Sequence, residues 1–176
     1  GGETDDARRF IAPTLLDETD PDKLEELTKN TILLRDAFDF DPKETLRTVQ
    51  QMVYQWGVTE AEAFNLIVQG AQNGLNKNDN LLDTINEYGP KFKSLGLTAE
   101  ETLNALANGA KHGVFDVDKL GDSINELTIR LKDGTADEQL EKIGYNASNV
   151  AKKISAGGDQ AKQAYLDVFK TLANMD

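Results

Sequence analysis

The sequence contains an internal repeat, and this repeat limits the possible folds more than any other feature. Aligning residues 57–87 with residues 96–126, a shift of 39 positions, gives identity at 13 of 31 positions. The identical pairs are Gly57/Gly96, Thr59/Thr98, Glu62/Glu101, Asn65/Asn104, Gly70/Gly109, Ala71/Ala110, Gly74/Gly113, Asp79/Asp118, Leu81/Leu120, Asp83/Asp122, Ile85/Ile124, Asn86/Asn125 and Glu87/Glu126. A period of about 40 residues is typical of stacked helical hairpins, in which each hairpin buries its apolar face against its neighbours.

Fainter copies extend the repeat in both directions. Thr98-Ala99-Glu100-Glu101 recurs as Thr135-Ala136-Asp137-Glu138 at a shift of 37, and Phe38-Asp39-Phe40-Asp41 matches Phe115-Asp116-Val117-Asp118. We therefore expect one helical repeat domain over residues 22–176, preceded by an acidic lead-in and a cloning or protease scar over residues 1–21. The predicted units, about four in number, are 22–56, 59–95, 98–133 and 135–174.

The spacing of apolar residues predicts helices and no sheet. In one segment the intervals between apolar residues are 3, 4, 3 and 4, which places them on one stripe of a helix. These residues are Val117, Leu120, Ile124, Leu127 and Leu131. No segment alternates apolar and polar residues over five or more positions in a run rich in β-branched side chains. The fold class is therefore predicted to be all-α, an array of stacked helical hairpins.

Capping residues predict where the helices begin. Asp20-Pro21 and Asp41-Pro42 each place an acceptor before a proline suited to the first helical position. Four pairs have the spacing of a capping box, in which Glu stands three residues after the cap. These pairs are Asp41/Glu44, Thr59/Glu62, Thr98/Glu101 and Thr135/Glu138.

Glycines predict where the helices end. Gly74, Gly113 and Gly134 follow the periodic runs, and Gly89-Pro90 is expected to break or kink a helix. A short helix is also possible before residue 17. The predicted helices are 21–37, 42–56, 60–73, 79–88, 91–95, 99–112, 117–132, 136–143, 147–155 and 159–174.

Composition excludes several classes of function. The chain has 176 residues, no cysteine, and 19 basic against 31 acidic side chains, for a net charge of -12. This charge disfavours generic binding to nucleic acid or to an anionic membrane. Apolar runs such as 32–34 and 66–68 are far shorter than the roughly 20 residues of a membrane helix. The chain opens with Gly1 rather than methionine, so we expect it to be a piece of a longer protein.

The acidic residues are concentrated near the start of the chain, which leaves two interpretations open. Residues 1–41 contain 12 acids and 5 bases. Solvated helix faces with acids in their first turns account for this pattern most simply. An acidic docking surface is the alternative.

One segment, which begins at Asn76, partly resembles a calcium-binding loop. Asn76, Asn78 and Asn80 stand at positions 1, 3 and 5 of such a loop, and Glu87 stands at position 12. Position 6 is Leu81, where a glycine is needed for the sharp turn. We therefore interpret the segment as a helix-capping turn, in which Asp79 and Asp118 are the expected caps.

No other motif predicts chemistry. His112 is the only histidine and is expected at the end of a helix, close to exposed carbonyl groups. No serine has a Gly-x-Ser-x-Gly frame, and no phosphate-binding loop is present. Gly70 and Gly109 lie within predicted helices, where we expect close helix crossings. We predict no catalytic, cofactor-binding or metal-binding residues, no cofactor and no enzymatic activity.

The order and spacing of many short runs resemble a segment of the tail tape measure proteins of long-tailed phages and prophages. The resemblance covers about residues 28–176. The runs are Phe38–Asp41, Trp56–Ile67, Gln69–Leu75, Leu82–Tyr88, Asn108–Ala110, Gly113–Asp122, Ile129–Gly134 and Ala156–Ala164.

The resemblance implies structural work in a long chain around which the tail tube assembles and whose length sets tube length. It implies a location in the virion tail, and in the host cytoplasm during assembly. Phage tail proteins or a tail-assembly chaperone would be the partners, and self-association is possible. Two alternatives stay open: a bacterial helical-repeat adaptor that binds a protein partner, and a non-catalytic accessory domain of a cell-wall hydrolase.

Overall fold

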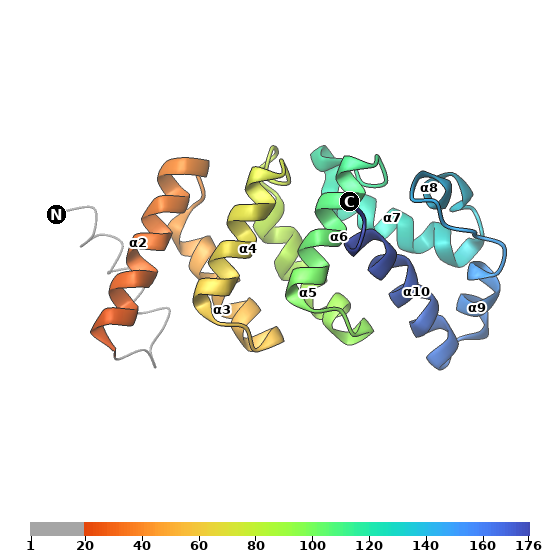
Figure 1. Ribbon diagram of the computed structural model, residues 1–176, viewed down its shortest axis with the longest axis horizontal. Helices are drawn as coiled ribbons and strands as arrows, with labels where there is room; N and C mark the ends of the chain where they lie inside the picture. The colour runs from red at the N-terminus through yellow and green to blue at the C-terminus, as the bar shows by residue number, and fades with distance from the viewer. Residues whose placement is uncertain (1–19) are drawn as a thin grey trace.

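A computed structural model describes residues 20–176, and this part of the chain is all-α, without strands (Figure 1). The predicted fold class is therefore confirmed. The predicted lead-in and the short helix before residue 17 lie outside the described residues. The helices are α2 (Pro21–Phe38), α3 (Pro42–Trp56), α4 (Glu60–Gln72), α5 (Leu81–Leu95), α6 (Ala99–Lys111), the 3₁₀-helix η1 (Val117–Lys119), α7 (Leu120–Asp133), α8 (Asp137–Lys142), α9 (Val150–Ala156) and α10 (Gly158–Ala173).

The helices form two layers. In the first layer, α2 packs beside α4 and α4 packs beside α6 (Figure 1). In the second layer, α3 packs beside α5 and α5 packs beside α7. Successive helices connect the layers as hairpins, and the core lies between the layers. Each hairpin therefore buries its apolar face against its neighbours.

The ends of the helices keep the period of the sequence. The N-caps of α2, α4 and α6 are Asp20, Thr59 and Thr98, so each of these helices begins 39 residues after the previous one. Gly57 and Gly96 close α3 and α5 in the left-handed conformation and are also 39 residues apart. The local capping signals thus set the register of the first three hairpins.

Three of the four predicted capping pairs supply a cap, and one does not. Thr59/Glu62 and Thr98/Glu101 form complete capping boxes, and Asp41 accepts a hydrogen bond from the Glu44 amide. The prediction for Thr135 is wrong. The Thr135 hydroxyl donates to the side chain of Asp133, and α8 begins after Ala136 without a side-chain cap.

Of the predicted break or kink at Gly89-Pro90, the break is wrong, because α5 runs without interruption through both residues. Packing explains the continuity. Gly89 faces the indole of Trp56 on α3, and a Cβ at Gly89 would lie 3.2 Å from the ring. The indole Nε1 donates to the carbonyl of Leu97 at 3.1 Å, beyond the end of α5. Contacts on both sides of Pro90 therefore hold a helix that the proline alone would weaken.

The last part of the array departs from a simple hairpin. The period places the next first-layer helix near residue 138, and α8 does begin at Asp137, but it ends after six residues. Gly144, with φ of 69°, follows that end. The place beside α6 that the period assigns to α8 is taken by α10, whereas α9 packs beside α7 (Figure 1). In residues 135–174 the second-layer helix therefore precedes the first-layer helix along the chain.

The repeated glycines make room for side chains rather than for a crossing helix backbone. A Cβ at Gly70 would lie 3.0 Å from Cδ2 of Leu81. A Cβ at Gly109 would overlap the ring of Phe115, which is only 3% exposed. The predicted close helix crossing is wrong at Gly109, where the neighbour belongs to the turn after α6.

Candidate interaction surface

The turn that resembles a calcium-binding loop is occupied by hydrogen bonds within the protein. Asn76 Oδ1 accepts from the amide of Leu81 at 3.2 Å, and Asn78 Nδ2 donates to the carbonyl of Asp118 at 3.1 Å. Asn78 thus connects the turn before α5 to the start of α7. Asp79 has φ of 54° and directly precedes Asn80, the N-cap residue of α5, which forms no side-chain cap bond.

The predicted caps at Asp79 and Asp118 are therefore wrong. The amide of Asp118 is itself capped, because it donates to Asp116 Oδ1 at 2.9 Å. The capping oxygens come from Asn76 and Asp116, each a few residues earlier than expected. Among residues 20–176, no group of three or more His, Cys, Asp and Glu side chains is placed to hold a metal ion.

His112 lies at the C-cap of α6, as its position in the sequence indicates. Its Nδ1 is 2.9 Å from the carbonyl oxygen of Asn108. Because a carbonyl oxygen only accepts, Nδ1 carries the proton and donates in this contact. The same carbonyl also accepts from the His112 amide at 2.9 Å, so the ring adds a second hydrogen bond at the helix end.

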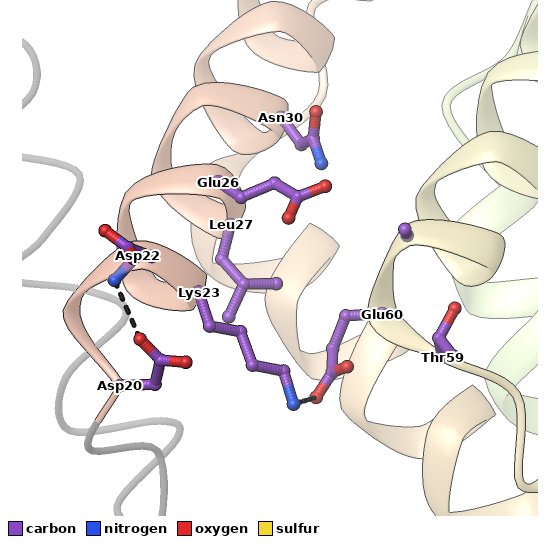
Figure 2. A pocket seen from close by; sticks show the side chains of 9 residues that line it. Asp20, Asp22, Lys23, Glu26, Leu27, Asn30, Thr59 and Glu60 are labelled. Atoms are coloured by element: carbon purple, nitrogen blue, oxygen red, sulfur yellow. Dashed lines mark hydrogen bonds and ion pairs between the residues drawn. The ribbon is translucent and has the colours of Figure 1, made fainter.

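A groove lies between the N-terminal parts of α2 and α4 and has a volume of about 460 Å³ (Figure 2). Its lining residues are Asp20, Asp22, Lys23, Glu26, Leu27, Asn30, Thr59, Glu60 and Ala61. Four of these side chains are acidic and one is basic. Lys23 from α2 and Glu60 from α4 point toward one another, with Nζ and Oε1 3.3 Å apart.

Two of the residues that line the groove have a structural role in the helices. The Thr59 hydroxyl accepts from the Glu62 amide as part of the capping box of α4, so it serves the helix end. Leu27, only 2% exposed, lines the groove beneath the charged residues. The exposed carboxylates of Asp20, Asp22 and Glu26 can bind a cationic or amide group of a partner.

Exposed apolar residues also occur outside the groove. The large exposed side chains among residues 20–176 are Leu33 on α2, Tyr54 on α3 and Ile129 on α7, which are 58%, 91% and 54% exposed. They belong to three different helices. No helix in this part of the chain is long and apolar enough to cross a membrane.

The sequence analysis did not recognise the role of Asn108. Its Nδ2 on α6 lies 2.8 Å from the carbonyl oxygen of Leu172 and 3.1 Å from that of Met175. The side chain therefore donates to carbonyl groups at the end of α10, and the Leu172 carbonyl also accepts from the Met175 amide at 3.3 Å. An asparagine within a helix is too common to predict such a contact 64 residues away.

Replacing Asn108 by alanine is expected to lower the free energy of unfolding by about 1 kcal/mol, because the carbonyls of α10 lose a donor. The measurement is urea unfolding followed by circular dichroism. Asn65 is the matched control, since it is exposed on α4, one turn before the position equivalent to Asn108, and Asn65→Ala is expected to change stability by less than about 0.5 kcal/mol. Equal effects at both positions would contradict the capping role.

The fold and its surfaces define a class of protein, an array of helical hairpins that presents extended lateral faces. Comparison with known proteins then gives the family. The sequence matches the family described as phage-related minor tail protein over residues 17–176, and the chain belongs to this family.

A curated relative supports the same assignment. A "Probable tape measure protein" of Streptomyces phage phiC31 is 51% identical to this chain over 105 residues, which are 58% of this chain and 14% of that protein. The matched region is thus a small part of the length of that relative. No solved structure matches the chain. The resemblance to tail tape measure proteins is confirmed.

Proposed function

We propose that this chain is a structural segment of a tape measure protein that acts through protein contacts in tail tube assembly and in setting tail length. It performs no catalysis. It resides in the virion tail and is present in the host bacterium's cytoplasm while the tail assembles. The observation that carries the proposal is the 51% identity to a protein described as a probable tape measure protein.

The fold supports a role in binding proteins. Stacked hairpins create long lateral surfaces that contact partners without a central cavity. The groove between α2 and α4 adds carboxylates to such a surface, and the net charge of -12 favours basic partner surfaces over nucleic acid. The proposed partners are other phage tail proteins or a tail-assembly chaperone. The family match argues against an adaptor unrelated to phages.

We further propose that residues 22–176 act as one domain. Contacts between neighbouring helices link α2 to α7, α9 and α10 in one array. The apolar side chains of these helices belong to one core cluster. A cooperative unfolding transition, detected at the same urea concentration by circular dichroism and by Trp56 fluorescence, is expected. Two separate transitions would contradict this proposal.

The functional test is an in-frame deletion of the codons for residues 20–176 in the phage that encodes the chain, followed by electron microscopy of its particles. If each residue counts as extended helix, at about 1.5 Å per residue, tails shorten by roughly 240 Å. Shortened tails or a failure to form tails would support the proposal. Infectious particles with tails of unchanged length would contradict it.

A matched control separates length from folding. Phage carrying Tyr54→Ala, a change at a 91% exposed side chain, retain a folded segment of full length. These particles are expected to have tails of normal length. Shortened tails in this variant would show that length does not depend on the number of residues.

A further inference from the structure

The outer face of α2 differs from the equivalent faces of α4 and α6. The N-caps align the three helices, so the fifth residue after each cap occupies an equivalent place. This residue is Phe64 in α4 and Leu103 in α6, and each is only 3% exposed. In α2 the same place is taken by Glu25, whose side chain is 50% exposed.

The equivalent apolar residues face the preceding helix of the first layer. Leu103 Cδ1 lies 3.6 Å from the position of a Cβ built at Gly70, which is on α4. Leu103 therefore packs between α6 and α4. By the same register, Phe64 faces α2, and Glu25 faces the side of α2 that is remote from α4.

At the ninth residue after each cap, α2 again has a charged residue where α4 and α6 have an apolar one. Val68 in α4 and Ala107 in α6 are partly buried and pack against the core. The equivalent residue in α2 is Lys29, whose side chain is 73% exposed. Its Nζ lies 3.4 Å from Oε1 of Glu25, one helical turn earlier. An exposed ion pair thus stands where the later hairpins have an apolar pair, and Leu33, which is 58% exposed, follows Lys29 one turn later on the same side of α2.

The charged pair disfavours stacking. Burying Glu25 and Lys29 under another hairpin would remove both charges from water, and their mutual attraction does not reliably compensate for that loss. Helical arrays end in such polar faces, because an apolar end would accept further hairpins or other copies.

A polar stripe on α10 lies beside Tyr145, in an open groove that Asp167 and Thr171 also line. On α10, Gln163 Nε2 donates to Asp167 Oδ1 at 2.8 Å, and Thr171 donates to the backbone carbonyl of Asp167. These three residues follow one another at intervals of four along one side of the helix. Burial, with a smaller contribution from the charge of Asp167, raises the pKa of the neighbouring Tyr145.

We propose that the outer face of α2 carries a charged pair, Glu25 and Lys29, that prevents a second copy of this chain from stacking there. Partner proteins then bind to the lateral faces of the array. This inference does not depend on the tape measure function.

The test restores the apolar pair of α4 in α2. In the full chain, Glu25→Phe combined with Lys29→Val is expected to raise the constant for self-association at least about tenfold over the unsubstituted protein. Sedimentation equilibrium between about 10 µM and 1 mM measures this constant. The matched control is Glu126→Phe with Arg130→Val, which removes an exposed ion pair with the same spacing from α7.

The control and the unsubstituted chain are expected to remain monomeric. Equal self-association of the two double variants, no self-association of the α2 variant, or dimers of the unsubstituted chain cross-linked through α2 would each overturn the proposal. Circular dichroism checks the fold of each variant. If the α2 variant does not fold, the smaller pair Glu25→Leu and Lys29→Ala, which copies α6, is measured against the same predictions.

Discussion

Replacing Phe169 by alanine is expected to lower the free energy of unfolding by about 4 kcal/mol, the largest effect among the substitutions considered. Phe169 is 2% exposed, and its ring stacks edge to face on Phe92 with centroids 5.0 Å apart. This contact joins α10 to α5, so the substitution leaves a cavity between the last helix and the rest of the array. Urea unfolding followed by circular dichroism measures the loss.

The matched control is Tyr54→Ala, which removes an aromatic side chain that is 91% exposed. It is expected to change the free energy of unfolding by less than about 0.5 kcal/mol. If Phe169→Ala cost no more than Tyr54→Ala, α10 would not be packed on α5 as the structure shows.

Replacing Gly109 by alanine is expected to destabilise the protein by about 2 kcal/mol, although alanine favours helix formation more than glycine does. The added Cβ would overlap the buried ring of Phe115, which can escape only if the turn after α6 shifts. Chemical denaturation and the melting temperature both report this change.

Gly121 is the matched control because it also lies within a helix. A Cβ there would be 3.4 Å from Cε2 of Tyr88 and 3.9 Å from Oγ1 of Thr84, which are acceptable contacts. Gly121→Ala is therefore expected to leave stability unchanged or to raise it by up to about 1 kcal/mol. A loss at Gly121 as large as that at Gly109 would mean that the position of Phe115 is not the cause.

Local signals predicted the elements of the repeated part because each signal acts within a few residues. The hydrogen bond between the Thr98 hydroxyl and the Glu101 amide needs only the two ends of a four-residue segment. The same holds for Thr59/Glu62. The start of each first-layer helix was therefore readable from sequence, and the period of 39 followed from repeated local signals.

Predictions failed where a distant contact competed with the local signal. Gly89-Pro90 would end a helix in isolation, but Trp56 packs on Gly89 and bonds to Leu97 beyond the proline. Thr135 had the spacing of a cap, but its hydroxyl was taken by Asp133. In both cases the nearby sequence allowed two arrangements.

On the polar surface, too, the sequence predicted the composition, whereas the structure showed which residues lie together. Sequence composition indicated an acidic front of the chain, and one of the two open interpretations was a docking surface. Only the structure brought Lys23 and Glu60 from two helices to the edges of one groove. Glu25 and Lys29 stand where α4 and α6 have apolar residues, and only the structure showed which helices begin at equivalent N-caps and how exposed these two side chains are.

The amino-acid sequence thus determined the all-α class, the helix starts at Pro21, Glu60 and Ala99, and the family. The tertiary structure decided the order of the last helices, because α10 lies beside α6 through contacts such as Asn108 with Leu172, 64 residues apart. Caps and periodicity act over one or two turns of helix, whereas the choice between α8 and α10 for the same place depends on the total apolar surface that each buries. α8 has six residues and α10 has sixteen, so the longer helix occupies the position beside α6.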